Sequence, residues 1–334
     1  MSTGKLTFYE DATRAWGLIQ ADALALLAKL PDACVDAIVT DPPYGIGFKG
    51  EAWDGADIYR AAHKDGERLS NGEAFASWTR VWAAECRRVL KPGGHLLAFG
   101  APRTFHRLTS GVEDAGLEIR DVLMWVYAQG APKARGLPGG LAPLLKPAYE
   151  PILLARAPLI GTTLRNLQEW GTGALNTESA RVNGYWPAHI ALSHAPGCTN
   201  AHCTSNCPAG LLDMAHPELR PSRLFFSSKA SKREREAGCD ELPLQSDLLY
   251  SRPAVRLRRN IHPTVKPLAL MRWLVKLVTP VGGVVLDPFT GSASTGVAAV
   301  MEDRVFLGIE REAKYIDIAC ARLTHHAHEA RESA

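Results

Sequence analysis

The sequence has no long hydrophobic run, and this absence argues against a protein that crosses a membrane. No apolar stretch approaches the ~18 residues that span a bilayer. Met1–Glu10 is polar, so no signal peptide is expected there. Hydrophobic residues make up 46% of the 334 residues and charged residues 22%, as is ordinary for a globular protein. The length suits one large domain with an insertion, or two domains.

The chain also lacks a strong excess of charge and an even set of cysteines. A formal net charge of +3 does not by itself indicate a polyanionic partner, so any basic surface must be local. The seven cysteines are odd in number, and three of them lie between Cys198 and Cys207. This pattern is unlike a secreted disulfide framework and predicts a protein of the reducing cytoplasm.

Short β-branched runs alternate with helical patterns at both ends of the chain. Strands are expected at 35–39, 95–99, 122–127, 284–286 and 305–309, and helices at 23–30, 73–90, 104–114, 268–278, 294–301 and 313–325. This alternation predicts an α/β fold of the Rossmann-like type, with a mainly parallel sheet and helices on both faces. Residues 129–260 are instead dense in Gly, Pro, Ser, Asn and Arg, with only short apolar runs such as Ile152–Leu154. A loop-rich stretch of this length usually carries function.

An acidic motif, Asp287-Pro-Phe-Thr-Gly-Ser292, follows the strand expected at 284–286. Glu310 ends the next expected strand, 23 positions after Asp287, where nucleotide-binding βαβ units place the acid that holds ribose hydroxyls. A dinucleotide site is disfavoured because Gly-x-Gly-x-x-Gly is absent and Asp287 would repel a pyrophosphate. An ordinary turn would explain Gly291 but not Glu310. The motif therefore favours an amine or sulfonium ligand such as S-adenosylmethionine.

A second acidic motif, Asp41-Pro-Pro-Tyr44-Gly, follows the strand expected at 35–39. The exocyclic amine of adenine or cytosine is a poor nucleophile, and acceptors aimed at its N–H bonds would localise its lone pair. Asp41 and the Pro42 carbonyl can accept such bonds, and Tyr44 can stack on the base. An amine hidden in a duplex must first be flipped out. A plain turn would also explain this motif alone, but its pairing with the Asp287 motif favours catalysis.

Together these segments resemble the β class of amino-group DNA methyltransferases, in which the acceptor motif precedes the cofactor motif. The resemblance covers most of residues 15–325. It rests on Asp22-Ala-Leu, Asp41–Tyr44, Val89–Gly94, Lys146–Pro151, His262–Pro267, Asp287–Ser292 and Phe306–Glu310.

The resemblance implies a site-specific enzyme that methylates double-stranded DNA with S-adenosyl-L-methionine as cofactor. Asp41, Pro42 and Tyr44 would be catalytic. Asp22 would contact the cofactor's adenine and Glu310 its ribose. Further cofactor contacts are expected from Asp41, Pro42, His262, Thr264, Lys266, Asp287, Pro288, Phe289, Gly291 and Ser292. In this family Asp rather than Ser at position 41 favours adenine N6 as the target, with cytosine N4 as the alternative.

The middle of the chain would then recognise the target sequence. Catalytic parts are expected at 1–156 and 258–334, separated by a target-recognition region at 157–257. Within or beside that region, DNA contacts are expected from Arg252, Arg256, Arg258 and Arg259, because residues 252–259 contain no acid. The acids of Ser231–Glu236 offset its bases, which predicts a solvated surface helix.

A compact group of metal-ligand types lies in the same region. Cys198, Cys203 and Cys207, with His194, have the ligand types of a structural zinc site. His202 is a rival for the fourth ligand. The spacing matches no standard zinc finger, so a loop of reduced thiols is the alternative.

Other functions remain open at this point. The same cofactor could serve an RNA or protein-amide acceptor, or a DNA-binding protein could have lost catalysis. Intact Asp41, Tyr44, Asp287 and Glu310 disfavour such a loss, and the basic insertion favours a duplex. The residues leave open the recognition sequence, a monomer or a homodimer, and whether a cognate restriction endonuclease accompanies the protein.

Overall fold

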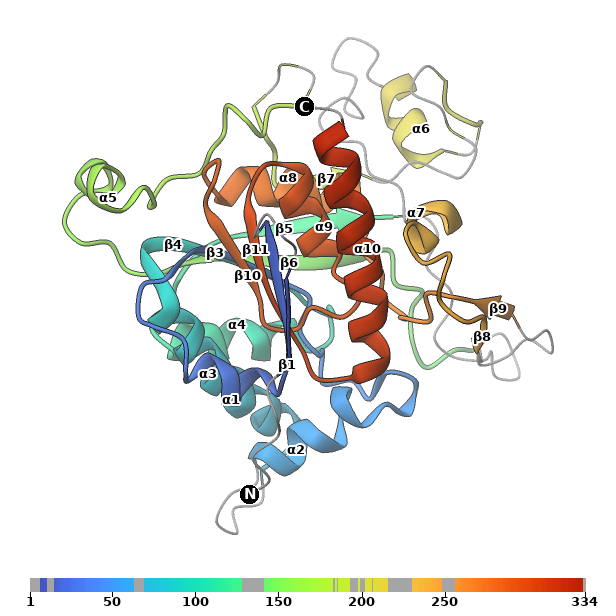
Figure 1. Ribbon diagram of the computed structural model, residues 1–334, viewed down its shortest axis with the longest axis horizontal. Coiled ribbons are helices and arrows are strands. Elements are labelled where there is room, and N and C mark those ends of the chain that lie inside the picture. Colours follow the sequence, from blue (N-terminus) through green and yellow to red (C-terminus); the bar gives the residue numbers. More distant parts are fainter. Residues whose placement is uncertain are drawn as a thin grey trace.

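The computed structural model describes residues 7–10, 15–62, 69–127, 141–182, 184, 186–192, 198, 202–205, 207–215, 230–247 and 256–332. A nine-stranded sheet forms its centre, in the order β1-β2-β11-β10-β3-β4-β6-β5-β7 (Figure 1). The strands are β1 (Thr7–Glu10), β2 (Trp16–Gln20), β3 (Val35–Thr40), β4 (Leu90–Phe99), β5 (Glu118–Val126), β6 (Tyr149–Arg156), β7 (Ile190–Leu192), β10 (Val284–Asp287) and β11 (Val305–Glu310). The block from β2 to β4 is parallel throughout, whereas β1 and β6 are antiparallel to their neighbours. Strands β8 (Gln245–Asp247) and β9 (Arg256–Arg258) form a separate antiparallel ribbon.

Helices cover both faces of the sheet (Figure 1). One face carries α1 (Ala23–Leu27), α3 (Asn71–Val89) and α4 (Phe105–Asp114), with α2 (Ala56–Ala62) packed on α3; the other carries α8 (Leu268–Val278), α9 (Ser294–Met301) and α10 (Ala313–Glu332). Successive strand residues serve opposite layers: Leu96 belongs to the core under α3, and Leu97 to the core under α8. The expected α/β fold is confirmed. No helix in the described part of the chain has the length and apolarity of a membrane span.

The sheet brings the two acidic motifs together. Strands β3 and β10 are parallel neighbours, with Ile38 opposite Leu286, so their carboxyl ends lie at the same edge. From this pair the chain continues to β4 on one side and to β11 on the other. Such a reversal of strand order opens a crevice at the carboxyl ends, where α/β proteins bind their ligands.

The largest difference from expectation is β6, within a stretch expected to be loop-rich. It lies between β4 and β5 and is antiparallel to both. Ile152, Leu153 and Leu154 are at most 3% exposed. The strand was missed because a run of three apolar residues is too short to show the alternation of apolar and polar residues that is typical of a strand. Its hydrogen-bond partners also come from elsewhere in the chain.

Three further helices, α5 (Thr163–Trp170), α6 (Pro208–Ala215) and α7 (Lys232–Glu236), lie in the expected insertion. They sit at the periphery of the molecule in Figure 1. The same part of the chain also contributes β7, which pairs with β5 and extends the central sheet.

Candidate active site

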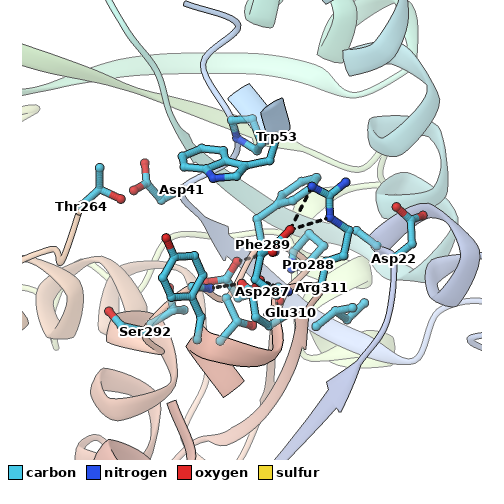
Figure 2. Close-up of a pocket in the computed structure, with 18 of the residues that line it drawn as sticks. Asp22, Asp41, Trp53, Thr264, Asp287, Pro288, Phe289, Ser292, Glu310 and Arg311 are labelled. Atoms are coloured by element: carbon cyan, nitrogen blue, oxygen red, sulfur yellow. Dashed lines mark hydrogen bonds and ion pairs between the residues drawn. The ribbon is translucent and has the colours of Figure 1, made fainter. Parts of the chain in front are cut away.

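A pocket opens at the carboxyl ends of β3, β10 and β11 (Figure 2). Its lining includes most residues of the two acidic motifs and of the segment before α8. Those expected from the sequence are Asp22, Asp41, His262, Thr264, Lys266, Asp287, Pro288, Phe289, Gly291, Ser292 and Glu310. In Figure 2, Asp41 and Thr264 lie at one end of the view and Asp22 at the other, with Phe289 and Pro288 between them. Pro42 and Tyr44 lie beside the pocket rather than in its lining.

A hydrogen bond joins the two motifs directly. Thr40 Oγ1, at the end of β3, donates to Asp287 Oδ1 at 2.7 Å, and the Phe289 N–H donates to the same oxygen at 3.1 Å. Asp287 is only 2% exposed. Burial raises the pKa of Asp287 to about 6, because a low-dielectric environment penalises the ionised form, and the hydrogen bonds oppose this rise only in part.

Glu310 is held by the backbone on both oxygens. The Gly291 N–H donates to Oε2 and the Glu312 N–H donates to Oε1, each at 2.7 Å. Burial nevertheless raises the pKa of Glu310 to about 7. Gly291 has a φ of +54°, and a Cβ there would lie 2.5 Å from His262 Nε2, so only glycine fits between the two segments.

Aromatic side chains form an apolar part of the pocket. Phe289 packs on Trp78 and Trp82 of α3, with ring centroids 5.7 Å apart in both cases. Trp53 also lines the pocket, and its buried Nε1 has no hydrogen-bond partner among the described residues. Asp22 caps the start of α1 by accepting from the Ala25 N–H, as expected for its position before a helix. No sequence pattern indicated a role for Trp53, which lies in a short 3₁₀ turn.

Asp41 lies in a buried cluster of charged and phenolic groups. Its Oδ1 accepts from the Tyr44 hydroxyl and its Oδ2 from Lys266 Nζ, both at 2.7 Å. Lys266 also contacts Glu150 Oε2 of β6 at 3.2 Å, and Tyr44 donates to the same oxygen at 3.2 Å. Burial disfavours the charged form of Lys266, but the two carboxylates outweigh it and raise the pKa of Lys266. Lys266 therefore stays protonated and is shared between Asp41 and Glu150.

Comparison with known families matches the model for DNA methylase, covering N6 and N4 methyltransferases, to residues 35–321. The chain belongs to this DNA methylase family. The assignment made from the sequence motifs is therefore confirmed. As a member of this family the methylase acts on DNA and takes its methyl group from S-adenosyl-L-methionine.

The methylase is similar along most of its length to known type II methyltransferases. It is 25% identical to type II methyltransferase M.HindIII of Haemophilus influenzae, over 92% of this chain and 94% of that protein. It is 24% identical to type II methyltransferase M2.LlaDCHI of Lactococcus lactis subsp. cremoris, over 92% and 88%. Among solved structures, the cytosine-N4-specific PvuII DNA methyltransferase aligns with a TM-score of 0.58 over 98% of both chains at 14% identity. That likeness supports the fold.

The loop after the methylase's Asp41 motif is organised by a residue that sequence analysis missed. Asp54 is 1% exposed, and its carboxylate accepts from the backbone N–H groups of Tyr44, Gly45, Ile46 and Phe48. Thr104 Oγ1 also donates to the Tyr44 carbonyl at 2.7 Å. The loop is thus fixed by its main chain, which leaves the Tyr44 side chain in place beside Asp41. A lone Asp in a Gly-rich loop offers no sequence signal for such a role.

The surface helix expected at 231–236 is present as α7, none of whose residues is buried, but its charged side chains also bind the neighbouring segment of the chain. Glu234 accepts from the Leu268 N–H at the start of α8, and Arg235 Nη2 donates to the His262 carbonyl at 2.7 Å. Glu236 accepts from the Arg259 N–H at 3.1 Å. These acids bind backbone donors of the methylase's 259–268 segment as well as facing solvent. The alternating charges of α7 did not indicate these contacts, because the partners lie more than 20 residues further along the chain.

The residues expected to contact DNA are only partly described. Arg252 and the Arg256 side chain lie outside the described residues. Arg258 is in β9, and Arg259 Nε donates to the Asp240 carbonyl at 3.0 Å. Of the expected zinc ligands, the sulfurs of Cys198, Cys203 and Cys207 come together. His194 lies outside the described residues.

Proposed function

We propose that this DNA methylase transfers the methyl group to N6 of a flipped adenine in a specific duplex sequence. The observation that carries the proposal is the Thr40–Asp287 hydrogen bond, which puts the Asp41 acceptor motif against the pocket. Adenine is favoured because position 41 is Asp rather than Ser. N4 of cytosine is the second candidate, since the PvuII structure that aligns with this chain is cytosine-N4-specific.

The target base can be identified directly. Plasmid DNA from cells expressing the chain would be digested to nucleosides and analysed by mass spectrometry, with modification-sensitive sequencing for the context. We expect N6-methyladenine at one sequence motif. N4-methylcytosine instead would establish the second candidate, and unmodified DNA from cells containing soluble protein would refute both.

The pocket fits S-adenosylmethionine in its chemistry. Bound there, this cofactor supplies an electrophilic methyl group on a sulfonium centre. Asp287 would face the cationic end, and the Glu310 carboxylate would accept from the ribose hydroxyls. His262 Nδ1 is buried without a partner among the described residues, and burial lowers the pKa of His262 to about 3, so its neutral ring can serve a polar ligand group. Phe289 and Trp53 would pack on the cofactor's adenine, with Asp22 nearby.

The acceptor chemistry would be carried by Asp41, Pro42 and Tyr44. Asp41 and the Pro42 carbonyl would accept from the two N–H bonds of the amine, which localises its lone pair and stabilises positive charge as the new N–C bond forms. The S–methyl bond of the cofactor would break in the same step and leave a neutral thioether, and the methylated nitrogen would then lose one proton to water by way of the Asp41 carboxylate. In the free protein both Asp41 oxygens are already occupied, by Tyr44 and Lys266. Each oxygen can accept a second hydrogen bond, so the target amine would share Asp41 with these donors or displace one of them.

Glu150 offers the displaced donors an alternative partner, which gives a test. When the amine binds, Lys266 and Tyr44 would shift their hydrogen bonds from Asp41 to Glu150. Glu150→Gln removes the negative charge that attracts Lys266 to this position, so Lys266 would bind Asp41 more strongly. We expect kcat to fall about tenfold or more, as for a loss of about 1.4 kcal/mol, with an unchanged affinity for S-adenosylmethionine. Glu113→Gln is the matched control, because Glu113 is exposed on α4. Glu118→Gln would not serve, because Glu118 pairs with Arg156. Single-turnover rates near wild type for Glu150→Gln would contradict this role.

Cofactor binding should depend on pH through Asp287 and Glu310. Burial raises their pKa values to about 6 and about 7. The cationic end of the cofactor would favour the ionised form of Asp287, and the ribose hydroxyls would favour the ionised form of Glu310. S-adenosylmethionine should therefore bind more tightly as the pH rises through 6 to 7 and then reach a plateau. The same two groups have the opposite effect on the stability of the ligand-free protein. Their contribution to its free energy of unfolding is lost as the pH rises through their raised pKa values. Calorimetric titrations across this range, with Glu310→Gln for comparison, measure the effect. An affinity that is constant or falls with pH would contradict it.

We propose further that residues 157–257, between catalytic parts 1–156 and 258–334, read the target sequence, with Arg252, Arg256, Arg258 and Arg259 on the DNA backbone. Each phosphate contact releases a counterion, so removing one should lower the slope of log affinity against log salt by about 1. We expect this for Arg256→Ala and Arg258→Ala, measured by fluorescence anisotropy on a duplex. Arg80→Ala, exposed on α3, should leave the slope unchanged. Equal slopes for all three variants would rule out these contacts.

A further inference from the structure

Three cysteine sulfurs converge in the part of the chain that carries α6. The Sγ atoms of Cys198, Cys203 and Cys207 all lie within 4.8 Å of one another, although the residues span ten positions of sequence. In a tetrahedral zinc site with Zn–S bonds of ~2.3 Å, the sulfurs lie about 3.8 Å apart. None of the seven cysteines, all of which lie in the described part of the chain, forms a disulfide. The spacing of the three sulfurs is therefore close to that of a shared metal.

The backbone around these sulfurs is arranged to support thiolates. The Thr204 N–H donates to Cys198 Sγ at 3.3 Å, and the Gly210 N–H, in the first turn of α6, donates to Cys207 Sγ at 3.4 Å. Donors of this kind stabilise negative sulfur and orient a metal ligand. A Cβ on Gly210 would lie 2.7 Å from Cys203 Cβ. Only glycine lets the helix approach the middle cysteine this closely.

A metal explains the cluster better than packing or a disulfide does. A disulfide would join two sulfurs and leave the third without a bond. Helix α6 exposes 52% of Leu211 and 76% of Met214, so these large side chains add little buried apolar surface that could hold the segment together. Small loop-rich segments of this kind are commonly stabilised by a bound metal. Thiolates in a tetrahedral arrangement favour zinc over magnesium or calcium, which prefer oxygen ligands.

We propose that Cys198, Cys203 and Cys207 bind one structural zinc ion, with a fourth ligand from outside these three side chains. The ion ties the loop at 198–207 to the start of α6. It lies apart from the pocket, none of whose lining residues belongs to this segment. Zinc binding can therefore be measured without methyl transfer, and its test does not require activity.

Metal analysis of the purified full-length chain, without an affinity tag that binds metals, tests the proposal. We expect one zinc per chain by plasma mass spectrometry, and less than about a tenth of that in Cys203→Ser and in the triple Cys→Ser variant. Cys34→Ser, whose thiol lies before β3, is the matched control and should retain the zinc. Cobalt exchanged into the wild type should give the intense visible absorption of tetrahedral cobalt–thiolate, which Cys203→Ser should lose.

A variant that fails to fold would not decide the matter, so a second measurement uses the wild type. A strong chelator should raise the number of rapidly alkylated thiols by three and speed protease cleavage near α6, while leaving the affinity for S-adenosylmethionine unchanged. Zinc-free wild-type protein whose three thiols react at once, with or without chelator, would overturn the proposal. So would a disulfide among the three cysteines in protein purified from the cytoplasm. Neither result would bear on methyl transfer.

Discussion

Asp41→Asn should lower kcat for methyl transfer by about 10² to 10³, the usual cost of removing one group that stabilises transition-state charge. The amide has nearly the shape of the carboxylate but presents an N–H₂ group, and it carries no negative charge to stabilise the amine as it becomes cationic. The fold should persist, because Lys266 keeps Glu150 as its counter-ion at 3.2 Å. Single-turnover transfer of labelled methyl to duplex DNA measures the effect.

The control for this variant is Asp114→Asn, an exposed carboxylate at the end of α4, which should transfer methyl groups at the wild-type rate. Calorimetry should show that Asp41→Asn still binds S-adenosylmethionine, so that the loss lies in kcat. A rate within about threefold of wild type would be inconsistent with the catalytic role given to Asp41.

Gly291→Ala should have the largest effect on cofactor binding. The left-handed φ of +54° costs an alanine about 1 to 2 kcal/mol. Its Cβ would also lie 2.5 Å from His262 Nε2, and overpacking of this kind costs roughly another 1 to 3 kcal/mol. Relief requires His262 or the Gly291 loop to move, and both line the pocket. Affinity for S-adenosylmethionine should fall by about 30-fold or more.

Gly282→Ala is the control that distinguishes the effect of backbone strain from the effect of the clash between residue 291 and His262. Gly282 has a φ of +73°, but a Cβ there would meet nothing within 4 Å. This variant should lose about 1 kcal/mol of unfolding free energy and bind the cofactor as wild type does. Denaturant melts and calorimetric titrations of both variants provide the comparison. Equal cofactor affinities for the two variants would show that contact with His262 is unimportant.

Regular elements near the chain ends could be predicted because their signals are local. The bounds expected for α8 and α9 agree with the structure. Pro267 and Pro280 flank the periodic segment that forms α8, and the short apolar segment that forms α9 lies between two expected strands. Strands β3 and β10 were expected to within one residue. Strand β6 was not, because its apolar run is short and its pairing partners lie more than 20 residues away.

In the site, too, features with a local sequence signal were predicted and features that depend on distant partners were not. Asp41 and Asp287 were expected from their position after strands, and Glu310 from its spacing to Asp287. Asp57 and Glu312 also line the pocket and were not expected. Lys266 was expected to contact the cofactor. It lines the pocket, but its ammonium group contacts Asp41 and Glu150, which sequence analysis did not foresee. Glu150, Asp54 and the acids of α7 were missed. Each acts on a partner that sequence distance does not indicate.

The amino-acid sequence was sufficient to assign this methylase to its family, because it carries two acidic motifs after strands and a loop-rich insertion between them. These depend on residue type and on local patterns of strand and turn. Only the tertiary structure decided that β3 and β10 are neighbours, that Thr40 bonds Asp287, and that Lys266 is shared between Asp41 and Glu150. Strand pairing and buried charge clusters join residues more than 100 positions apart. Their free energy depends on contacts and desolvation that no local pattern records.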